Sequence, residues 1–581
     1  MRRSRTISAA ALLMGSALIL SACGGDGGDG DGAAEPGNIY ADCDANPNEC
    51  NAVPDDQLQD GGEISFAIEK NIPNWNIISS EGNVQESAFV LKGVLPYTFY
   101  AEPDFTVTMN EDVLVSAEQV SDDPQTIEYE IQPDAQWSDG TPINADDFIY
   151  NWKVQNGEDC PDCAPASTSG YDQVESVEGS DDGKTVTVTF KEPFTDWKVL
   201  WGSGGPMYPA HIAEENGGTD SPKGLAESFE WFGKNVPEYS GGPFKIENFQ
   251  DNESVTAVPN ENFWGEAPNL DRLIYRVITE ASEQPTALQN NEVQVIYPQP
   301  QVDFVDQIDA MQGVSSHIGM GLVWEHFDFN LKNKFLSDEP LRDALFTAVD
   351  RQGIIDKTVG QFTDKAEPLN SHNFVPGQDG YEDVVSEFGH GSGDVEAAKK
   401  ILTDAGYELS GGKLQTPDGK TVPEMRIRYT TGNEIRQNEC ELFAQAAKEL
   451  GVTVNVEPTD DLGGTLVEGD YDIIVFAWVS SPFPYSGAVQ LWTSDSGSNF
   501  GKYENEEVDK LLREAASETD TAVATEKLNE ADKIMSEDAY VLPLYQKPTF
   551  IAAHDNVANV RNNSTLDGPV YNVAEWGLRK E

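Results

Sequence analysis

The residues best suited to bind a ligand are aromatic and hydroxyl-bearing side chains in one uncharged run, Ile473 to Ser494. Within it, the stretch AWVSSPFPYSGAVQLW places two serines between large rings. Ring faces supply apolar area and hydroxyls supply hydrogen bonds, the combination that a small-molecule site presents to its ligand. The residues of this run that we predict to contact a ligand are Trp478, Ser480, Ser481, Phe483, Tyr485 and Trp492.

A place in the hydrophobic core is the alternative for the same rings. For Phe476 and Trp492 the core hypothesis is as good as the ligand hypothesis. It is weaker for Phe483 and Tyr485, because the SPFP phrase beside them cannot continue as a central strand. The proline-flanked rings are therefore the stronger candidates for a binding surface.

Known sequence motifs for catalysis and metal binding are absent from the chain or incomplete. The chain has no GxxxxGK[ST], no HExxH and no GxSxG. Of its six histidines, His317 and His326 lie nine residues apart on a strand-like segment, a weak basis for a metal site. DCDANPNEC begins like a calcium loop but has Pro47 where the loop needs glycine. We expect no catalytic residue, no metal and no cofactor.

The charge of the chain restricts its partners. It has 101 acidic and 37 basic residues, a net charge of -64 at pH 7. Such a surface repels the phosphates of nucleic acids and anionic lipid surfaces, so we expect neither as a specific partner.

The first residues predict export and lipid attachment. Three arginines precede the apolar run ISAAALLMGSALILSA, which is too short for a spanning helix and is typical of a signal peptide. The run ends in LSAC, which resembles the lipobox of bacterial lipoproteins. The resemblance implies removal of residues 1–22, acylation of Cys23 and anchoring on the outer face of the cell membrane. The Gly/Asp-rich segment that follows predicts a flexible tether over residues 23–60.

The other five cysteines fit an oxidising exterior. The nearest candidate pairs are Cys43 with Cys50 and Cys160 with Cys163, which leaves Cys440 over, but the sequence does not determine the connectivity. CPDC lacks the strand and helix context of a thioredoxin-like motif, so it predicts a loop staple or free thiols.

Hydrophobic periodicity predicts an α/β protein that needs several domains at 581 residues. EISFAIEK, TIEYEIQ and KTVTVTF alternate like strands, the last two antiparallel with Asp-Gly turns nearby. Thr141 is the expected cap of a helix that starts at Pro142. Later segments alternate helical and strand-like patterns, and YVLPLYQKPTFIAA predicts a closing pair of strands.

Several phrases in fixed order resemble the family 5 extracellular solute-binding proteins of bacterial ABC importers, which include oligopeptide-, dipeptide- and nickel-binding proteins. The most specific are QWSDGTPINADDFIYNW and SGGPFKIENFQDNESVTAVPNENFWG. The resemblance implies a bilobed fold of the periplasmic-binding-protein type II kind with a third subdomain. The implied regions are lobe I over 61–104, 240–278 and 541–581, an extra domain over 105–239, and lobe II over 279–540.

The resemblance also places a solute site between the lobes. Peptide-binding relatives often carry an acidic residue after the tryptophan of the strand that corresponds to YDIIVFAW, and here Ser480 and Ser481 stand in that phrase. A buried ammonium without an anion is costly, so either another acid supplies the charge or the solute has no free amine there. On lobe I the matching candidates are Glu69, Lys70, Asn71 and Trp75.

We therefore predict a lipid-anchored, non-enzymatic receptor that delivers an oligopeptide or peptide-like solute to the membrane permease subunits of an ABC importer. An oligosaccharide is the alternative solute, favoured by eleven tryptophans and the absent acid. A secreted hydrolase is a further hypothesis, which requires a carboxylate pair or a nucleophile facing the cleft. Nickel is disfavoured because histidines are few.

Overall fold

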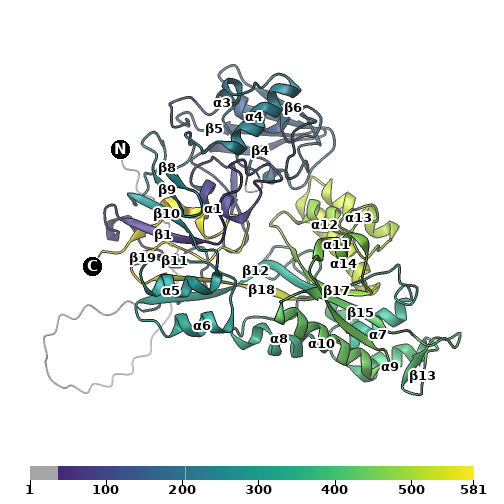
Figure 1. Cartoon of the computed structure of the whole chain (residues 1–581). Coiled ribbons are helices and arrows are strands. Elements are labelled where there is room, and N and C mark those ends of the chain that lie inside the picture. The colour runs from purple at the N-terminus through teal and green to yellow at the C-terminus, as the bar shows by residue number, and fades with distance from the viewer. Residues whose placement is uncertain (1–36, 203–204, 581) are drawn as a thin grey trace, which may run out of the picture. The chain divides into compact units, whose positions relative to one another are not determined.

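The computed structural model describes residues 37–202 and 205–580, so the expected signal peptide and Cys23 lie outside the described residues. One ten-stranded mixed sheet runs through the described chain, which confirms the α/β class (Figure 1). In spatial order its strands are β16 (Val454–Thr459), β15 (Met425–Thr430), β17 (Ile473–Val479), β12 (Val314–Phe329), β18 (Val541–His554), β11 (Val295–Ile296), β1 (Glu63–Ile68), β10 (Arg272–Val277), β9 (Ser254–Pro259) and β8 (Phe244–Gln250).

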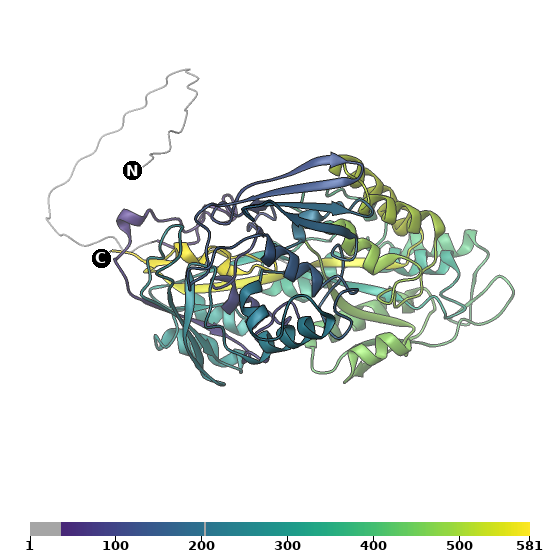
Figure 2. The ribbon, with the colours of Figure 1, turned by 90° about the horizontal axis from the view of Figure 1, so that it is seen from above.

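Two long antiparallel strands, β12 and β18, join the two halves of this sheet (Figure 2). Their pairing is irregular in the middle, where Met320 and Trp324 lie opposite Pro548 and Gln546. On one side of this irregularity β12 pairs with β17 of lobe II, and on the other β18 pairs with β11 of lobe I. The predicted closing pair of strands is thus one continuous strand, because its second partner comes from β12 and not from its own sequence.

The lobe I half is built on β1, whose residues after Glu63 are all buried between β10 and β11. Helices α5 and α6 pack with Ala67, Phe550 and Ala552. This packing places residues 284–309 beside lobe I, later in the chain than the boundary expected at 278. The helices of this half are α1 (Gln85–Lys92), α5 (Gln284–Gln289) and α6 (Val302–Asp309), with the short helices η3 (Ala281–Glu283) and η6 (Pro569–Glu575). Its small sheets pair β2 (Phe99–Ala101) with β3 (Val107–Met109) and β19 (Val557–Ala558) with β20 (Gly577–Leu578).

The extra domain has its own four-stranded antiparallel sheet, seen at the top of Figure 1. Its strands are β4 (Leu114–Asp122), β5 (Gln125–Ile131), β7 (Thr185–Phe190) and β6 (Val174–Gly179), and its helices are α2 (Ala145–Lys153), α3 (Ala210–Glu215), α4 (Pro222–Lys234) and η2 (Trp197–Val199). The expected antiparallel pairing of TIEYEI with TVTVTF is confirmed. The expected cap at Thr141 is wrong: Asn144 caps α2, and Asp147 completes a capping box.

Lobe II packs helices on both faces of its part of the sheet. Two hydrophobic clusters form there, one around Phe443 of α10 and one around Leu512 of α13. The helices are α7 (Glu339–Ala348), α8 (Arg351–Lys357), α9 (Val395–Asp404), α10 (Glu434–Glu449), α11 (Leu462–Glu468), α12 (Pro484–Trp492), α13 (Glu506–Ala516) and α14 (Thr521–Glu537), with η4 (Val359–Gln361) and η5 (Val385–Phe388). A separate hairpin pairs β13 (Glu408–Ser410) with β14 (Lys413–Gln415).

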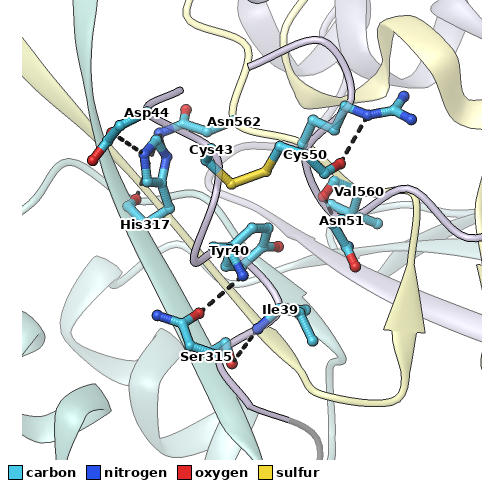
Figure 3. Close-up of a disulfide and its surroundings, with 12 residues drawn as sticks. Ile39, Tyr40, Cys43, Asp44, Cys50, Asn51, Ser315, His317, Val560 and Asn562 are labelled. Atoms are coloured by element: carbon cyan, nitrogen blue, oxygen red, sulfur yellow. Dashed lines mark hydrogen bonds and ion pairs between the residues drawn. A yellow bond between two sulfur atoms is a disulfide. The ribbon is translucent and has the colours of Figure 1, made fainter. Parts of the chain in front are cut away.

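Residues 38–60, which include η1 (Asp55–Gln57), form an ordered strap, and Figure 3 shows the part of it around the Cys43–Cys50 disulfide. A Cys43–Cys50 disulfide closes it, and Asn51 donates to the Val560 carbonyl at 3.1 Å. Ser315 accepts from the Ile39 backbone, and His317 lies 2.9 Å from Asp44. The expectation of a flexible tether to residue 60 is therefore wrong for this segment, because its apolar residues are buried.

Cys160 and Cys163 also form a disulfide, and Cys440 is free and buried. CPDC is thus a loop staple. Among the described residues, no helix is both long and apolar enough to cross a membrane.

Candidate functional site

The uncharged run is divided by the fold into a strand, a turn and a helix. β17 ends at Val479, and α12 begins at Pro484. The turn between them breaks the strand where the SPFP phrase predicts, because prolines cannot pair in a central strand. The run therefore places Phe476 and Trp478 in the strand, Phe483 and Tyr485 at the start of the helix, and Trp492 at its end.

Trp478 belongs to an aromatic stack at the end of β17. Its ring is nearly parallel to His326 at 6.0 Å and to Phe500 at 5.9 Å, measured between ring centroids. Phe476 packs edge-on against it at 5.0 Å. These neighbours pack on the indole, which is half-buried, so the structure gives Trp478 a packing role in lobe II.

The two serines are engaged by the fold. The Ser480 hydroxyl accepts from the Trp324 indole at 3.0 Å, and the Ser481 hydroxyl accepts from the Phe483 backbone at 3.1 Å. The Ser481 carbonyl accepts from the Gln378 side chain at 2.9 Å. These bonds fix the turn that presents Phe483.

Phe483 and Tyr485, which are 8% and 6% exposed, border an inter-lobe cavity of about 320 Å³. Its lining comes from lobe II, from the extra domain and from the segment before β3 of the lobe I half. The wall from lobe II includes Phe374 and Asp379, and the opposite wall includes Trp197. The full lining is Asp104, Phe105, Thr106, Val107, Thr195, Asp196, Trp197, Lys198, Phe374, Gly377, Gln378, Asp379, Pro482, Phe483, Pro484, Tyr485 and Thr521. Its large rings offer apolar area, and its carboxylates and one ammonium offer charged partners.

Trp492 and Phe476 lie in the lobe II core. Trp492 is 1% exposed and donates its indole N–H to Asn373 at 3.0 Å. Phe476 is 3% exposed. For these two rings the structure favours the core hypothesis.

The four candidates on lobe I are dispersed. Trp75 is buried and packs edge-on against Phe249 at 5.1 Å between ring centroids. Asn71 donates to Asp251 at 2.6 Å beside the β8–β9 hairpin. Lys70 is exposed. The Glu69 carboxyl lies near Gln284, and burial, followed by the charge of Glu86, raises its pKa. None of the four lines the inter-lobe cavity described above.

Sequence reasoning missed the extra-domain wall of the cavity, which is the segment Thr195–Lys198. It lies roughly 290 positions before the α12 residues that it contacts, for example Asp196 with Ser486. No local pattern in the sequence indicates so distant a pairing.

A second cavity, of about 610 Å³, lies within lobe I beneath the strap. Its lining includes Glu49 and Asp55 of the strap, Tyr97, and Arg561 near the C-terminal end of the chain. Since lobe II contributes no lining residue to it, closure of the lobes would not enclose a ligand there.

One buried cluster has the residue types of a hydrolytic triad. The His372 ring lies 2.6 Å from Asp532, and the Ser371 hydroxyl donates to the same carboxylate at 2.5 Å. The serine thus bonds to the acid and not to the imidazole, and the other ring nitrogen lies 3.0 Å from the Val541 carbonyl. All three residues are at most 2% exposed, so the cluster supports the fold and cannot reach a substrate.

The family profile described as "Bacterial extracellular solute-binding proteins, family 5 Middle" matches residues 109–500. The oligopeptide-binding protein OppA of Mycobacterium tuberculosis is 31% identical over 514 residues, which cover 86% of this chain and 83% of OppA. The solved structure of the periplasmic EDTA-binding protein EppA has a TM-score of 0.85 and 36% identity, and covers 92% of this chain and 99% of EppA. Bacillus subtilis AppA, solved with a nonapeptide, has a TM-score of 0.69 at 22% identity over 90% of this chain and 100% of AppA, which shows the shared fold.

Proposed function

Because the chain belongs to family 5 of the bacterial extracellular solute-binding proteins, we propose that it captures an oligopeptide between its lobes and delivers it to an ABC importer. The observation that carries this proposal is the aromatic cavity that lobe II and the extra domain build jointly, with Phe483 and Tyr485 in its wall. The names of OppA and the nonapeptide complex of AppA support a peptide as the solute. Peptide is therefore the first choice.

Capture works through the difference in contact between two arrangements of the lobes. A solute that touches both walls stabilises the arrangement in which the walls approach each other, and one that touches a single wall does not. Ring faces such as those of Phe105 and Phe374 bind varied apolar side chains, because apolar contact is not directional. This suits a receptor for peptides of mixed sequence.

The missing acid of the WVSSPFP phrase has a proposed substitute. Asp104 and Asp379 border the cavity from opposite sides, and Gln378 holds the loop of Asp379 against Ser481. We assign to these carboxylates the pairing with a peptide's α-amino group. The charge that relatives often carry after the tryptophan would then come from neighbouring loops.

A chelating polycarboxylate is the second candidate solute, favoured by the 36% identity to a protein whose title names EDTA. The cavity contains Lys198, which offers one positive charge to such an anion. Its carboxylates at Asp104, Asp196 and Asp379 would repel an anion, which is why the peptide ranks first.

We place the protein on the outer face of the cell membrane, attached through acylated Cys23 and facing the permease subunits of its importer. The lipobox-like LSAC and the apolar run before it support this placement. Closure around a solute would be the signal that the permease reads.

Mass spectrometry of the full chain, extracted from membranes in mild detergent, tests the proposal. We expect the solute released on denaturation to be a mixture of intact peptides, and the protein mass to begin at Cys23 with added acyl groups. A single polycarboxylate or a defined glycan would overturn the peptide proposal, and cleaved peptides would indicate a hydrolase. An unmodified cysteine would overturn the lipid anchor alone.

A further inference from the structure

The segment Thr195–Asp196 bridges the extra domain and lobe II. It follows β7 and directly precedes η2, and its hydrogen-bond partners lie in α12 and at the end of α13, 290 to 323 residues later in the chain. Asp196 is 4% exposed. Two adjacent residues thus make a polar contact between the extra domain and lobe II.

Asp196 caps a helix of the other region. The N-cap residue of α12, Phe483, provides no side-chain hydrogen bond to the first turn. The Asp196 carboxylate accepts from the Ser486 backbone and from the Ser486 hydroxyl, both at 2.7 Å. A carboxylate at a helix N-terminus satisfies free N–H groups and complements the helix dipole. The helix that carries Tyr485 therefore receives its cap from the extra domain.

Thr195 makes the complementary contact at a helix C-terminus. Its backbone N–H donates to the Ala516 carbonyl at 3.0 Å, and its hydroxyl lies 2.8 Å from the Ala515 carbonyl. The same hydroxyl lies 2.6 Å from the Glu518 carbonyl and accepts from the Glu518 backbone at 3.0 Å. The Ala515 and Ala516 carbonyls belong to the last turn of α13, which leaves them without helical partners, and Glu518 follows the helix.

The bridge is also part of the cavity wall. Thr195 and Asp196 line the inter-lobe cavity together with Phe483 and Tyr485. If the extra domain separates from lobe II, the cavity loses one wall and α12 loses its cap in the same step. Opening of the site and loosening of the first turn of α12 are therefore linked.

We propose that Thr195 and Asp196 form a latch that holds the extra domain on lobe II and sets how long a solute remains in the cavity. The residence-time part rests on the proposed function, because it assumes that the solute lies in this cavity. The docking part does not, since the hydrogen bonds join the two regions without a solute. Asp196 acts as a positioning residue: it places α12, and α12 places Tyr485.

Hydrogen exchange of the full chain without added solute tests the docking part. Asp196→Ala should raise exchange at least 10-fold in both the first turn of α12 and the residues after α13, although Asp196 bonds only to α12. Asp196→Asn, which keeps an acceptor oxygen, should restore most of the protection. Asp461→Ala is the matched control, because Asp461 caps α11 within lobe II through Gly464 at 2.9 Å. It should loosen α11 alone.

A second experiment tests whether the latch sets the residence time of the solute. It measures the dissociation of a radiolabelled nonapeptide that was selected for binding to the wild-type chain. Asp196→Ala should speed dissociation about 10-fold with association nearly unchanged, and Asp461→Ala should change neither rate. Exchange confined to α12 in Asp196→Ala, or equal protection in Asp196→Ala and wild type, would overturn the latch. If exchange rises in both segments but the rate of peptide dissociation is unchanged, the role in residence time is overturned and the docking contact still stands. If no nonapeptide binds, the proposed function fails and the exchange result alone decides on the latch.

Discussion

Arg436→Met is expected to lower the free energy of unfolding by about 3–5 kcal/mol, the usual cost of leaving a buried charge without its partner. The Arg436 guanidinium donates to both oxygens of Glu325, with nitrogen to oxygen distances of 3.0–3.2 Å. The two side chains are 10% and 3% exposed. Without the arginine, the one cation left within 4 Å of the Glu325 carboxylate among the described residues is Lys547, at 3.5 Å.

Urea denaturation provides the measurement, and a surface pair provides the control. Arg426 pairs with Asp470 at 2.9 Å with side chains 37% and 53% exposed, so Arg426→Ala should cost less than about 1 kcal/mol. Pairing Arg436→Met with Glu325→Gln should recover most of the loss, because the buried carboxylate that lost its partner is then neutral. A loss below about 1 kcal/mol in Arg436→Met would contradict the assigned role of this pair.

The cluster of Arg436, Glu325 and Glu439 also makes the stability of the protein depend on pH. Burial, followed by the charge of Glu325, raises the pKa of Glu439 to about 8. Its folded state then holds a proton that the unfolded chain releases near pH 4.5, so stability should fall as pH rises from about 4.5 to about 8. Glu439→Gln should flatten this part of the stability profile. An unchanged profile in Glu439→Gln would show that another group titrates.

The second large effect separates a core ring from a cavity ring. Trp478→Ala should lower the free energy of unfolding by about 3 kcal/mol, because the indole is stacked between His326 and Phe500. Phe483→Ala should also lower stability, because that side chain is only 8% exposed although it borders the cavity. It should in addition weaken peptide binding about 10- to 150-fold, the effect of losing about 1.5–3 kcal/mol of apolar contact.

Denaturation and equilibrium binding of the two variants, measured on the same preparations, check this division of roles. Trp478→Phe is the control that keeps a stacked ring, and it should retain most of the stability. If Phe483→Ala binds like wild type while Trp478→Ala loses affinity without losing stability, the site lies at the end of β17 and not at the cavity.

Local patterns predicted much of the fold. The strand periods of EISFAIEK and TVTVTF, the break at SPFP and both short-range disulfides have causes within a few residues, and the structure contains all of them. The errors arose where a distant segment decides the outcome. YVLPLYQKPTFIAA contains two prolines that favour a break, but pairing with β12 keeps it in one strand.

In the candidate site, too, a residue with a local signal could be predicted and residues placed by distant contacts could not. The proline neighbours of Phe483 exclude a strand, a local cause for the prediction that it contacts a solute, and the side chain borders the cavity. Trp75 and Trp492 have no local signal that separates a core ring from a surface ring, and both are buried. Asp196 and Phe374 could not be predicted, because only the folded chain brings residues so far apart in sequence to one cavity.

Titration of the solute-free full chain with a nonapeptide pool, followed by its thermal midpoint, tests the central claim most directly. We predict saturable binding and a higher midpoint, corresponding to about 2.7 kcal/mol of added stability when the free peptide reaches about 100 times its Kd. An iron–EDTA chelate and a neutral oligosaccharide, titrated in parallel, should have smaller effects. A midpoint unchanged by peptides but raised by either comparison solute would contradict the account.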